Sequence, residues 1–472
     1  MTSENPGFLA HLNATRNPSL NAELRGWAGL AMFSLALAGV FALLLAFSRI
    51  PGIQNILPLP LDFFDRGLVI HVVFSFVVWF QAVFGCLLNV STGRLANGTP
   101  RMQWIGKVAL AGAYASCVAL FLPAFMERGE ATLNNYIPAI TDPLYYAGLA
   151  LLAAAIGLMV LRLLINVIGS AGRWKEPLPF GTISIALIFG VALICFAITL
   201  GTLVDEPLSY EFNESLFWGG GHILQFANTA MLITAIFVLA RLTLKDIVLK
   251  DNQLTLTAMA ILVVYAGMGI SITLKYAPVH EKYWAMFTQF QYGLILPALL
   301  VGIPMLVDIL QQRRLGQGLP LRNPAFLCLA LSPVVFAAGG FLGLFVDGGD
   351  TRTPAHYHGI IAGINLSFMG LFYGFFLPLL DREVNRSKAL YAQIYMFGGG
   401  QLLASIGLFL AGGYGTPRKT AGGAQGLEAI GAKIGMYMNG IGALIAVIGG
   451  VMFIWMVSKA LLRAPRAGAS EA

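Results

Sequence analysis

Apolar runs of roughly 20 residues or more recur along the whole chain, and they constrain its fold more than any other feature. A run of this length crosses the hydrocarbon core of a bilayer as one α-helix. With 57% hydrophobic and 11% charged residues, the chain has too little polar surface for a soluble globule of 472 residues. The predicted fold class is therefore all-α, a polytopic membrane bundle of about 12 transmembrane helices. The predicted spans cover residues 26–48, 66–90, 103–125, 142–168, 181–203, 215–241, 254–276, 285–310, 325–346, 353–380, 389–412 and 433–460.

Polar segments flank the predicted bundle. Residues 1–25 carry no signal-peptide pattern and the first apolar run is too long for a signal peptide, so we expect the first span to be retained. Lys and Arg concentrate in the loops on the side of the N terminus, which the positive-inside rule places in the cytoplasm. We predict a cytoplasmic N-terminal segment over 1–25, a single twelve-helix domain over 26–460 and a cytoplasmic tail over 461–472, in the inner membrane of the cell.

Acidic residues collect in the loops of the opposite, outer side. Such a surface suits a basic donor protein or an attached electron-donating subunit, although ordinary solvated loops explain any single residue equally well. The residues are Asp62, Asp65, Glu127, Glu130, Asp205, Glu206, Glu211, Glu214, Asp347 and Asp350.

The four cysteines all fall inside apolar runs, and none belongs to a CxxC or CxxCH pattern. We therefore expect them to pack in the core. We expect no disulfide framework, no covalently attached haem and no copper pair ligated by cysteine.

Five of the six histidines are predicted to lie at similar depth near the outer face. His71 is in the second span, His222 in the sixth, His280 just beyond the seventh, and His356 and His358 open the tenth. Ionisable residues in a membrane are costly unless something binds them, so a functional interpretation is favoured over satisfaction by neighbouring side chains. Residues two apart on a helix point about 200° away from each other, so the tenth span could hold one haem on each side.

Haem chemistry explains this layer of imidazoles. A six-coordinate low-spin haem needs two axial nitrogens, which His71 and one histidine of the tenth span could supply. The other histidine of the tenth span would hold a second haem with one axial position open. A small gas could bind there, with His222 reaching toward it from the sixth span.

These residues together resemble the catalytic subunit I of the haem-copper oxidase superfamily, which includes oxygen reductases and the related nitric oxide reductases. The resemblance runs from the second to the twelfth span, and rests on the order of the spans, the histidine of span two, the WGGGH element Trp218–His222 and the HxH of span ten. It implies low-spin haem ligation by His71 and His358, high-spin haem ligation by His356 and a metal B ligand at His222. The implied cofactors are two haems, expected to be b-type, with a non-haem iron or copper at metal B.

The chain departs from that family pattern in the seventh span. Family members usually carry two adjacent histidines there as further metal B ligands, but the matching positions, 272–274, hold none. His280 and Glu281 lie beyond them, past a proline. Three alternatives stay open: metal B is absent, it is rebuilt from His222 with His280 and Glu281, or it recruits Gln225, which shares a helix face with His222.

Two further absences lead the sequence to favour NO over O2 as the substrate. Phe226 stands where oxygen reductases of the resembled family often place a tyrosine, and Tyr265 and Tyr276 fit the other usual position poorly. The inner halves of the predicted spans also show no buried carboxylate of the kind found in a pumping channel. Joining two NO molecules needs only two electrons, whereas O–O cleavage needs the extra electron of a phenol. Position 226 also lacks the glutamate typical of nitric oxide reductases, so that match is incomplete too.

The expected function is a membrane-bound terminal reductase subunit that takes electrons from a donor subunit, cytochrome c or quinol. Lys275 and Arg352 are candidate partners of haem propionates, with ordinary snorkelling as the alternative. A non-catalytic haem-b protein for electron transfer or gas sensing that has lost metal B is the second hypothesis, and a proton-coupled transporter the third. We expect contact with the lipid bilayer and none with nucleic acid.

Overall fold

A computed structural model describes residues 6–48, 63–126, 128–244, 253–314, 316, 318–346, 348–420 and 422–464. The chain divides into two compact units. The first unit comprises Met1–Ser34 and Asp65–Leu319, and the second comprises Leu35–Phe64 and Pro320–Ala472. The single domain predicted over 26–460 stays a prediction.

Twelve spans of the described residues are helical, long and apolar enough to cross a membrane, so the all-α bundle of a multi-pass membrane protein is confirmed. The first unit holds α1 (Pro6–Asn13), the first part of α2 (Pro18–Ser48), α3 (Phe63–Val72), the π-helical η2 (Val73–Val78), α4 (Trp79–Leu95), α5 (Gln103–Phe121), η3 (Leu122–Phe125), β1 (Ala131–Thr132), β2 (Ala139–Ile140), α6 (Pro143–Val167), η4 (Arg173–Lys175), α7 (Pro177–Thr202), α8 (Tyr210–Thr243), α9 (Gln253–Lys275), α10 (Glu281–Phe290), η6 (Gln291–Leu294) and α11 (Ile295–Arg314). The second unit holds the rest of α2, with α12 (Pro324–Gly343), α13 (Arg352–Leu371), η7 (Phe372–Phe376), α14 (Leu377–Leu379), α15 (Lys388–Gly413), η8 (Gly422–Gln425) and α16 (Ile430–Leu462).

Several helices begin before the predicted spans because polar capping residues lie outside an apolar window. Helix α6 is an exception, since it begins at Pro143, next to the predicted limit, where Asp142 accepts a hydrogen bond from the backbone N–H of Leu144 at 2.9 Å. Ser209 caps α8 through the N–H of Phe212 at 3.1 Å. Helix α2 likewise begins at Pro18, well before residue 26.

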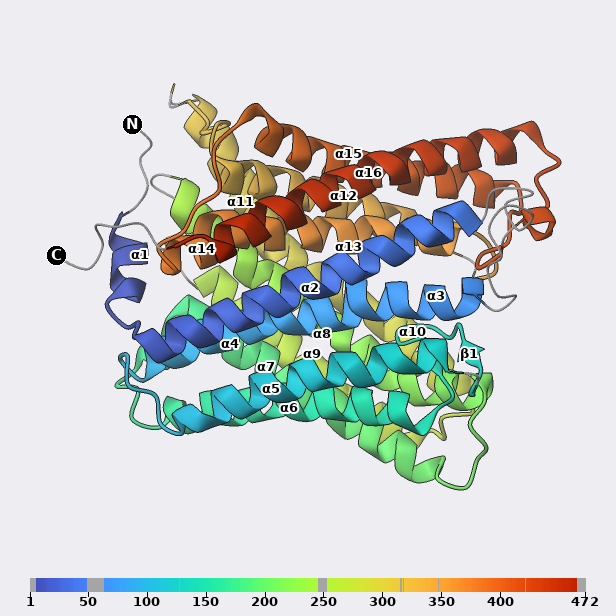
Figure 1. Cartoon of the computed structure of the whole chain (residues 1–472), viewed down its shortest axis with the longest axis horizontal. Coiled ribbons are helices and arrows are strands. Elements are labelled where there is room, and N and C mark those ends of the chain that lie inside the picture. The colour runs from blue at the N-terminus through green and yellow to red at the C-terminus, as the bar shows by residue number, and fades with distance from the viewer. Residues whose placement is uncertain are drawn as a thin grey trace. The chain divides into compact units, whose positions relative to one another are not determined.

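In the first unit, α8 is the most deeply buried of the membrane spans. Helix α7 packs along α8, and α5 packs along α6 (Figure 1). The connection between α5 and α6 carries the short antiparallel pair β1–β2, in which Ala131 faces Ile140.

The second unit is built on two close helix pairs, α12 with α13 and α15 with α16 (Figure 1). Gly339 and Gly343 of α12 and Gly359 and Gly363 of α13 form a GxxxG pattern on each helix. A Cβ atom at Gly359 would lie 2.6 Å from the Cα atom of Gly339, so the two backbones touch at this crossing. This close approach brings a carbonyl of α12 within reach of side chains on α13.

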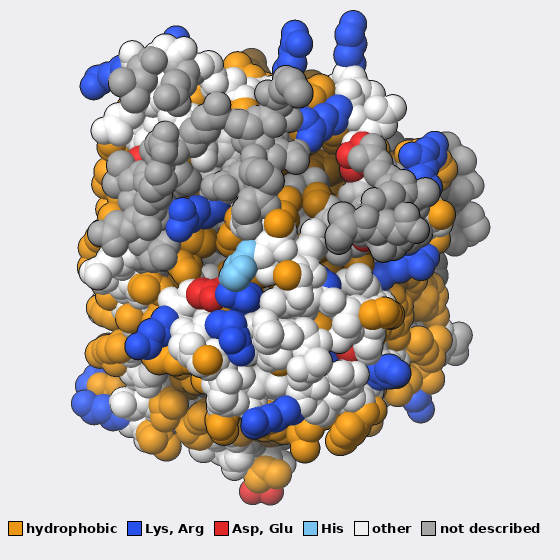
Figure 2. All heavy atoms as spheres, turned by 90° about the vertical axis from the view of Figure 1, so that its left-hand side faces the viewer, with side chains coloured by type: hydrophobic (Ala, Val, Ile, Leu, Met, Phe, Trp, Pro, Cys, Tyr) orange, Lys and Arg blue, Asp and Glu red, His pale blue; other side chains and the backbone are white. Residues whose placement is uncertain are grey.

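Basic loops gather at the end of the first unit where α1 lies. The side chain of Asn17 donates to the carbonyl of Gly98 at 2.6 Å, and Arg94 forms an ion pair with Glu176 at 2.6 Å. Figure 2 views the α1 end of the molecule, where the charged side chains are mostly Lys and Arg. Lys245 and Lys250, also assigned to this side by sequence, lie outside the described residues.

The sequence predicted that the inner halves of the spans hold no buried carboxylate of the kind found in a pumping channel, and this stays a prediction. Two carboxylates nevertheless lie buried within described spans. Glu23 lies on α2, is 4% exposed and forms an ion pair with Arg162 of α6 at 2.8 Å. Asp308 on α11 is also buried. Glu23 was missed because it precedes the apolar run of its own helix.

Candidate functional site

His356 lies on α13, and its imidazole ring packs against the glycines of α12. Its Nδ1 lies 2.8 Å from the carbonyl oxygen of Gly339. A Cβ atom at Gly343, one turn further along α12, would overlap Nδ1 of the same ring. The glycines of α12 therefore both admit the imidazole and fix its orientation.

The protonation of His356 follows from this contact. A carbonyl oxygen only accepts hydrogen bonds, so Nδ1 carries the proton and Nε2 keeps its lone pair. Metal-binding histidines commonly donate their second ring nitrogen to such a carbonyl, which orients the ring and increases its basicity. His356 therefore fits an axial ligand of haem iron.

The other two predicted haem ligands also lie near helix termini. His358 follows on α13 and is partly buried, with its ring 5.1 Å from that of Tyr357. His71 lies in the last turn of α3, directly before the π-helical segment η2, a type of distortion frequent at functional sites. His71 belongs to the first unit and His358 to the second, so their shared ligation of one haem stays a prediction.

His222 is enclosed by aromatic rings in the first unit. The ring centroids of Tyr136, Trp218 and Phe287 lie 4.7, 4.9 and 5.6 Å from that of His222. Nδ1 of His222 donates to the carbonyl of Trp218 at 2.8 Å, and Nε2 accepts from the hydroxyl of Tyr136 at 2.9 Å. Both ring nitrogens therefore have protein partners.

The three glycines of the WGGGH element each make room for a different ring. A Cβ atom at Gly219 would overlap Tyr283, one at Gly220 would overlap Phe196, and one at Gly221 would overlap Tyr136. Rings from α7, from α10 and from the connection between α5 and α6 thus converge on one turn of α8. The glycines of the motif therefore make room for aromatic side chains on several sides of this turn.

The donors around His222 do not fit a metal ion. The side chain of Gln225 bonds within its own helix, donating to the carbonyl of Gly221 at 3.4 Å and accepting from Asn228 at 3.3 Å. Across the described residues, no group of three or more His, Cys, Asp or Glu side chains is placed to hold a metal. A non-haem metal at this position would need ligands that the surroundings of His222 do not offer.

His280 and Glu281 lie at the start of α10, and both side chains are exposed. Nδ1 of His280 accepts the backbone N–H of Lys282 at 3.0 Å and so caps the helix. The α10 residues Tyr283, Trp284 and Phe287 contact the WGGGH turn instead. The proposal that His280 and Glu281 ligate metal B stays untested.

The two candidate propionate partners differ in their surroundings. The guanidinium of Arg352 binds the carboxylate of Asp350 at 2.7 Å, which already balances its charge. Lys275 ends α9, is exposed and lies over the ring of Tyr276 at 5.4 Å. Arg352 is therefore already paired with a carboxylate, whereas the ammonium group of Lys275 is exposed.

Tyr136 is a site residue that the sequence analysis missed, and it places a phenol beside His222 from outside the two positions usual in the family. It comes from the connection between α5 and α6, and it has a φ of 64° in the left-handed region, which is rare for tyrosine. Burial raises the pKa of its phenol, with a smaller contribution from Glu214, so the hydroxyl stays protonated as a hydrogen-bond donor. Phe226, by contrast, stacks on Tyr265 with ring centroids 6.3 Å apart.

The predicted acidic surface is smaller than the sequence suggested. Glu214 is buried and accepts a hydrogen bond from the backbone N–H of Asn135 at 2.6 Å. Asp350 is also buried, in its pair with Arg352. The exposed members are Asp65, Glu130, Asp205, Glu206 and Glu211, while Asp62, Glu127 and Asp347 lie outside the described residues.

The chain matches known proteins over almost its whole length. Residues 25–452 match the family model described as Cytochrome C and Quinol oxidase polypeptide I. An uncharacterised protein of Rickettsia prowazekii (strain Madrid E) is 24% identical over 512 residues, covering 95% of this chain and 98% of that protein. An uncharacterised protein of Aquifex aeolicus (strain VF5) is 28% identical over 352 residues, covering 73% and 82%. The fold is similar to that of a heme-copper terminal oxidase dimer solved by cryo-EM, with a TM-score of 0.77 and 16% identity over 95% of this chain and 85% of that one.

Proposed function

The chain belongs to the cytochrome c and quinol oxidase polypeptide I family, a family of oxidoreductases, and we propose that it is a di-haem membrane protein of an electron-transport chain. The proposed ligands are His71 and His358 for a low-spin haem and His356 for a high-spin haem, both b-type. Haem supplies a one-electron redox couple and, when high-spin, an open coordination position. The proposed electron donor is a donor subunit, cytochrome c or quinol, acting on an inner membrane protein with both termini in the cytoplasm.

The single observation that carries this proposal is the contact of the His356 ring with Gly339 and Gly343 of α12. The hydrogen bond from Nδ1 to Gly339 fixes the tautomer that presents a lone pair on Nε2. The close glycine contacts between α12 and α13 hold the ring in place before any ligand arrives. A preorganised neutral imidazole is a common protein ligand of a five-coordinate haem.

The proposed reaction is reduction of a small gas, NO or O2, at the high-spin haem. The sequence favoured NO because a phenol and a buried carboxylate were both expected to be missing. Phe226 still occupies the position of the family's tyrosine, but Tyr136 places a phenol beside His222. Glu23 is a buried carboxylate paired with Arg162. Both gases are therefore retained as candidate substrates.

A second candidate is a non-catalytic haem-b protein for electron transfer or gas sensing. The specific observation that favours it is the use of both ring nitrogens of His222 by Trp218 and Tyr136. In that case the high-spin haem would bind a gas without a neighbouring metal to assist its reduction.

The test is an optical and gas-uptake study of the purified protein reconstituted with haem. The proposal predicts two haems per chain, one of which binds carbon monoxide when reduced. Consumption of NO or O2 with an artificial donor would identify the substrate, and binding without consumption would support the second candidate. A colourless protein that takes up no haem would contradict both.

A further inference from the structure

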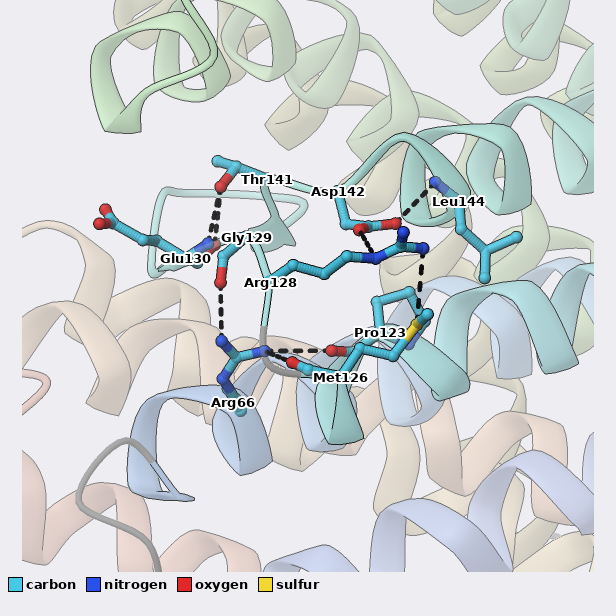
Figure 3. Close-up of polar contacts among 9 residues, drawn as sticks. All are labelled: Arg66, Pro123, Met126, Arg128, Gly129, Glu130, Thr141, Asp142 and Leu144. Atoms are coloured by element: carbon cyan, nitrogen blue, oxygen red, sulfur yellow. Dashed lines mark hydrogen bonds and ion pairs between the residues drawn. The ribbon is translucent and has the colours of Figure 1, made fainter.

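The connection that carries Tyr136 is tied down at both of its ends. From α3, the guanidinium of Arg66 donates to the carbonyls of Pro123 at 3.0 Å, Met126 at 3.2 Å and Gly129 at 2.6 Å (Figure 3). Arg128 forms an ion pair with Asp142 at 2.9 Å, and Asp142 also caps α6. We call residues 128–142 the cover segment.

The middle of the cover segment is fixed to α8, the helix of His222. Glu214, two turns before His222 and buried, accepts hydrogen bonds from both the backbone and the side-chain nitrogens of Asn135. Asn213 donates to the hydroxyl of Thr132 at 2.9 Å. Because its two ends and its middle are all held, the segment has little freedom to swing away from α8.

Tyr136 belongs to the cover segment, and its side chain contacts His222. Its hydroxyl lies 2.9 Å from Nε2, the ring nitrogen that keeps a lone pair because Nδ1 donates to the Trp218 carbonyl, and its ring lies against Gly221, where a Cβ atom would be 2.5 Å from the Tyr136 Cγ. Phe287 and Trp218 cover other sides of the imidazole. A metal ion at Nε2 would have to break the Tyr136 hydrogen bond and displace a ring packed on the backbone of α8.

We propose that Tyr136 takes the place of a second metal at His222, so that this position is a metal-free tyrosine–histidine pair closed by the cover segment. The inference rests on the proposed function only in taking His222 as the metal B position of the family. It involves no haem ligand, and it holds whichever gas binds at the haem.

The primary test uses the wild-type, haem-loaded protein and needs no variant. Non-haem iron and copper are measured by elemental analysis, before and after incubation with ferrous and cuprous ions and removal of excess metal. If Tyr136 replaces the metal, both samples should contain far less than one non-haem metal ion per chain. About one metal ion per chain, lost in His222→Ala, would overturn the proposal. Haem content and carbon monoxide binding of the same samples report separately on the proposed function.

A double-mutant cycle in thermal unfolding tests the contact itself. Tyr136→Phe and His222→Ala should each lower Tm, and the double variant should fall by less than the sum of the two, because both remove the same hydrogen bond. Tyr114→Phe, which removes a hydroxyl that donates to the carbonyl of Gly26 at 3.1 Å, is the control and should be additive with His222→Ala. Additive effects of Tyr136→Phe and His222→Ala would show that the two residues do not act as a pair.

Discussion

Arg162 on α6 and Glu23 on α2 form an ion pair of 2.8 Å whose side chains are 0% and 3% exposed. A Cβ atom at Gly106 of α5 would overlap both of them, so α5 closes over the pair. Asn89 of α4 also donates to Glu23 at 3.2 Å. The pair therefore joins four helices of the first unit.

Replacing Glu23 with Ala should destabilise the protein strongly, because Arg162 would keep a buried charge without its partner. The expected loss is about 3 kcal/mol or more, seen as a large drop in Tm in detergent. Glu206→Ala, at an exposed residue, is the control and should leave Tm almost unchanged. Equal Tm values for the two variants would show that the ion pair does not support the fold.

Replacing His356 with Ala should abolish the haem that binds carbon monoxide, because the only proposed protein ligand of that iron would be lost. The low-spin spectrum should persist. His280→Ala, which removes an exposed helix cap, serves as the control and should keep both haem signals. Retention of carbon monoxide binding in His356→Ala would rule out the ligand assignment.

Replacing Gly343 with Ala should displace the ring of His356, since the added methyl group would overlap Nδ1. We expect reduced occupancy of the carbon-monoxide-binding haem and a stability loss of about 1–3 kcal/mol from overpacking. The neighbouring Gly340 has ordinary space for a methyl group, so Gly340→Ala should behave like wild type. The measurement compares the haem spectra of the two variants. Identical spectra would contradict the packing of His356 against Gly343.

Replacing Gly221 with Ala should push Tyr136 away from α8, because the two groups share the same space. The expected result is a lower Tm, by about 1–3 kcal/mol in free energy, with changed fluorescence of Trp218, which packs on Tyr136 at 5.8 Å. Gly267→Ala on α9 meets open space and is the control. Unchanged fluorescence in Gly221→Ala would argue against the packing of Tyr136 on this turn.

The helices could be predicted from sequence because a bilayer forces every span to be long, apolar and internally hydrogen-bonded. The predicted limits failed where polar residues belong to the helix. Glu23 illustrates this: it lies within α2, yet its charge placed it outside the apolar window.

The contacts of the site depend on helix register, which an apolar pattern does not specify. Nothing in the sequence of α13 indicates that His356 meets Gly339, because that contact requires the depth at which α12 crosses. Tyr136 was missed for a related reason. It reaches His222 from a loop 86 residues away in sequence and with a rare backbone conformation, and neither leaves a local signal.

Arg66 and His71 share the short helix α3, and Arg66 holds three carbonyls around the start of the cover segment. Any displacement of that segment would therefore pull on the same ten-residue helix that presents His71. We therefore expect a variant that loosens the cover segment, such as Arg66→Ala, to change the spectrum of the haem that His71 is proposed to bind.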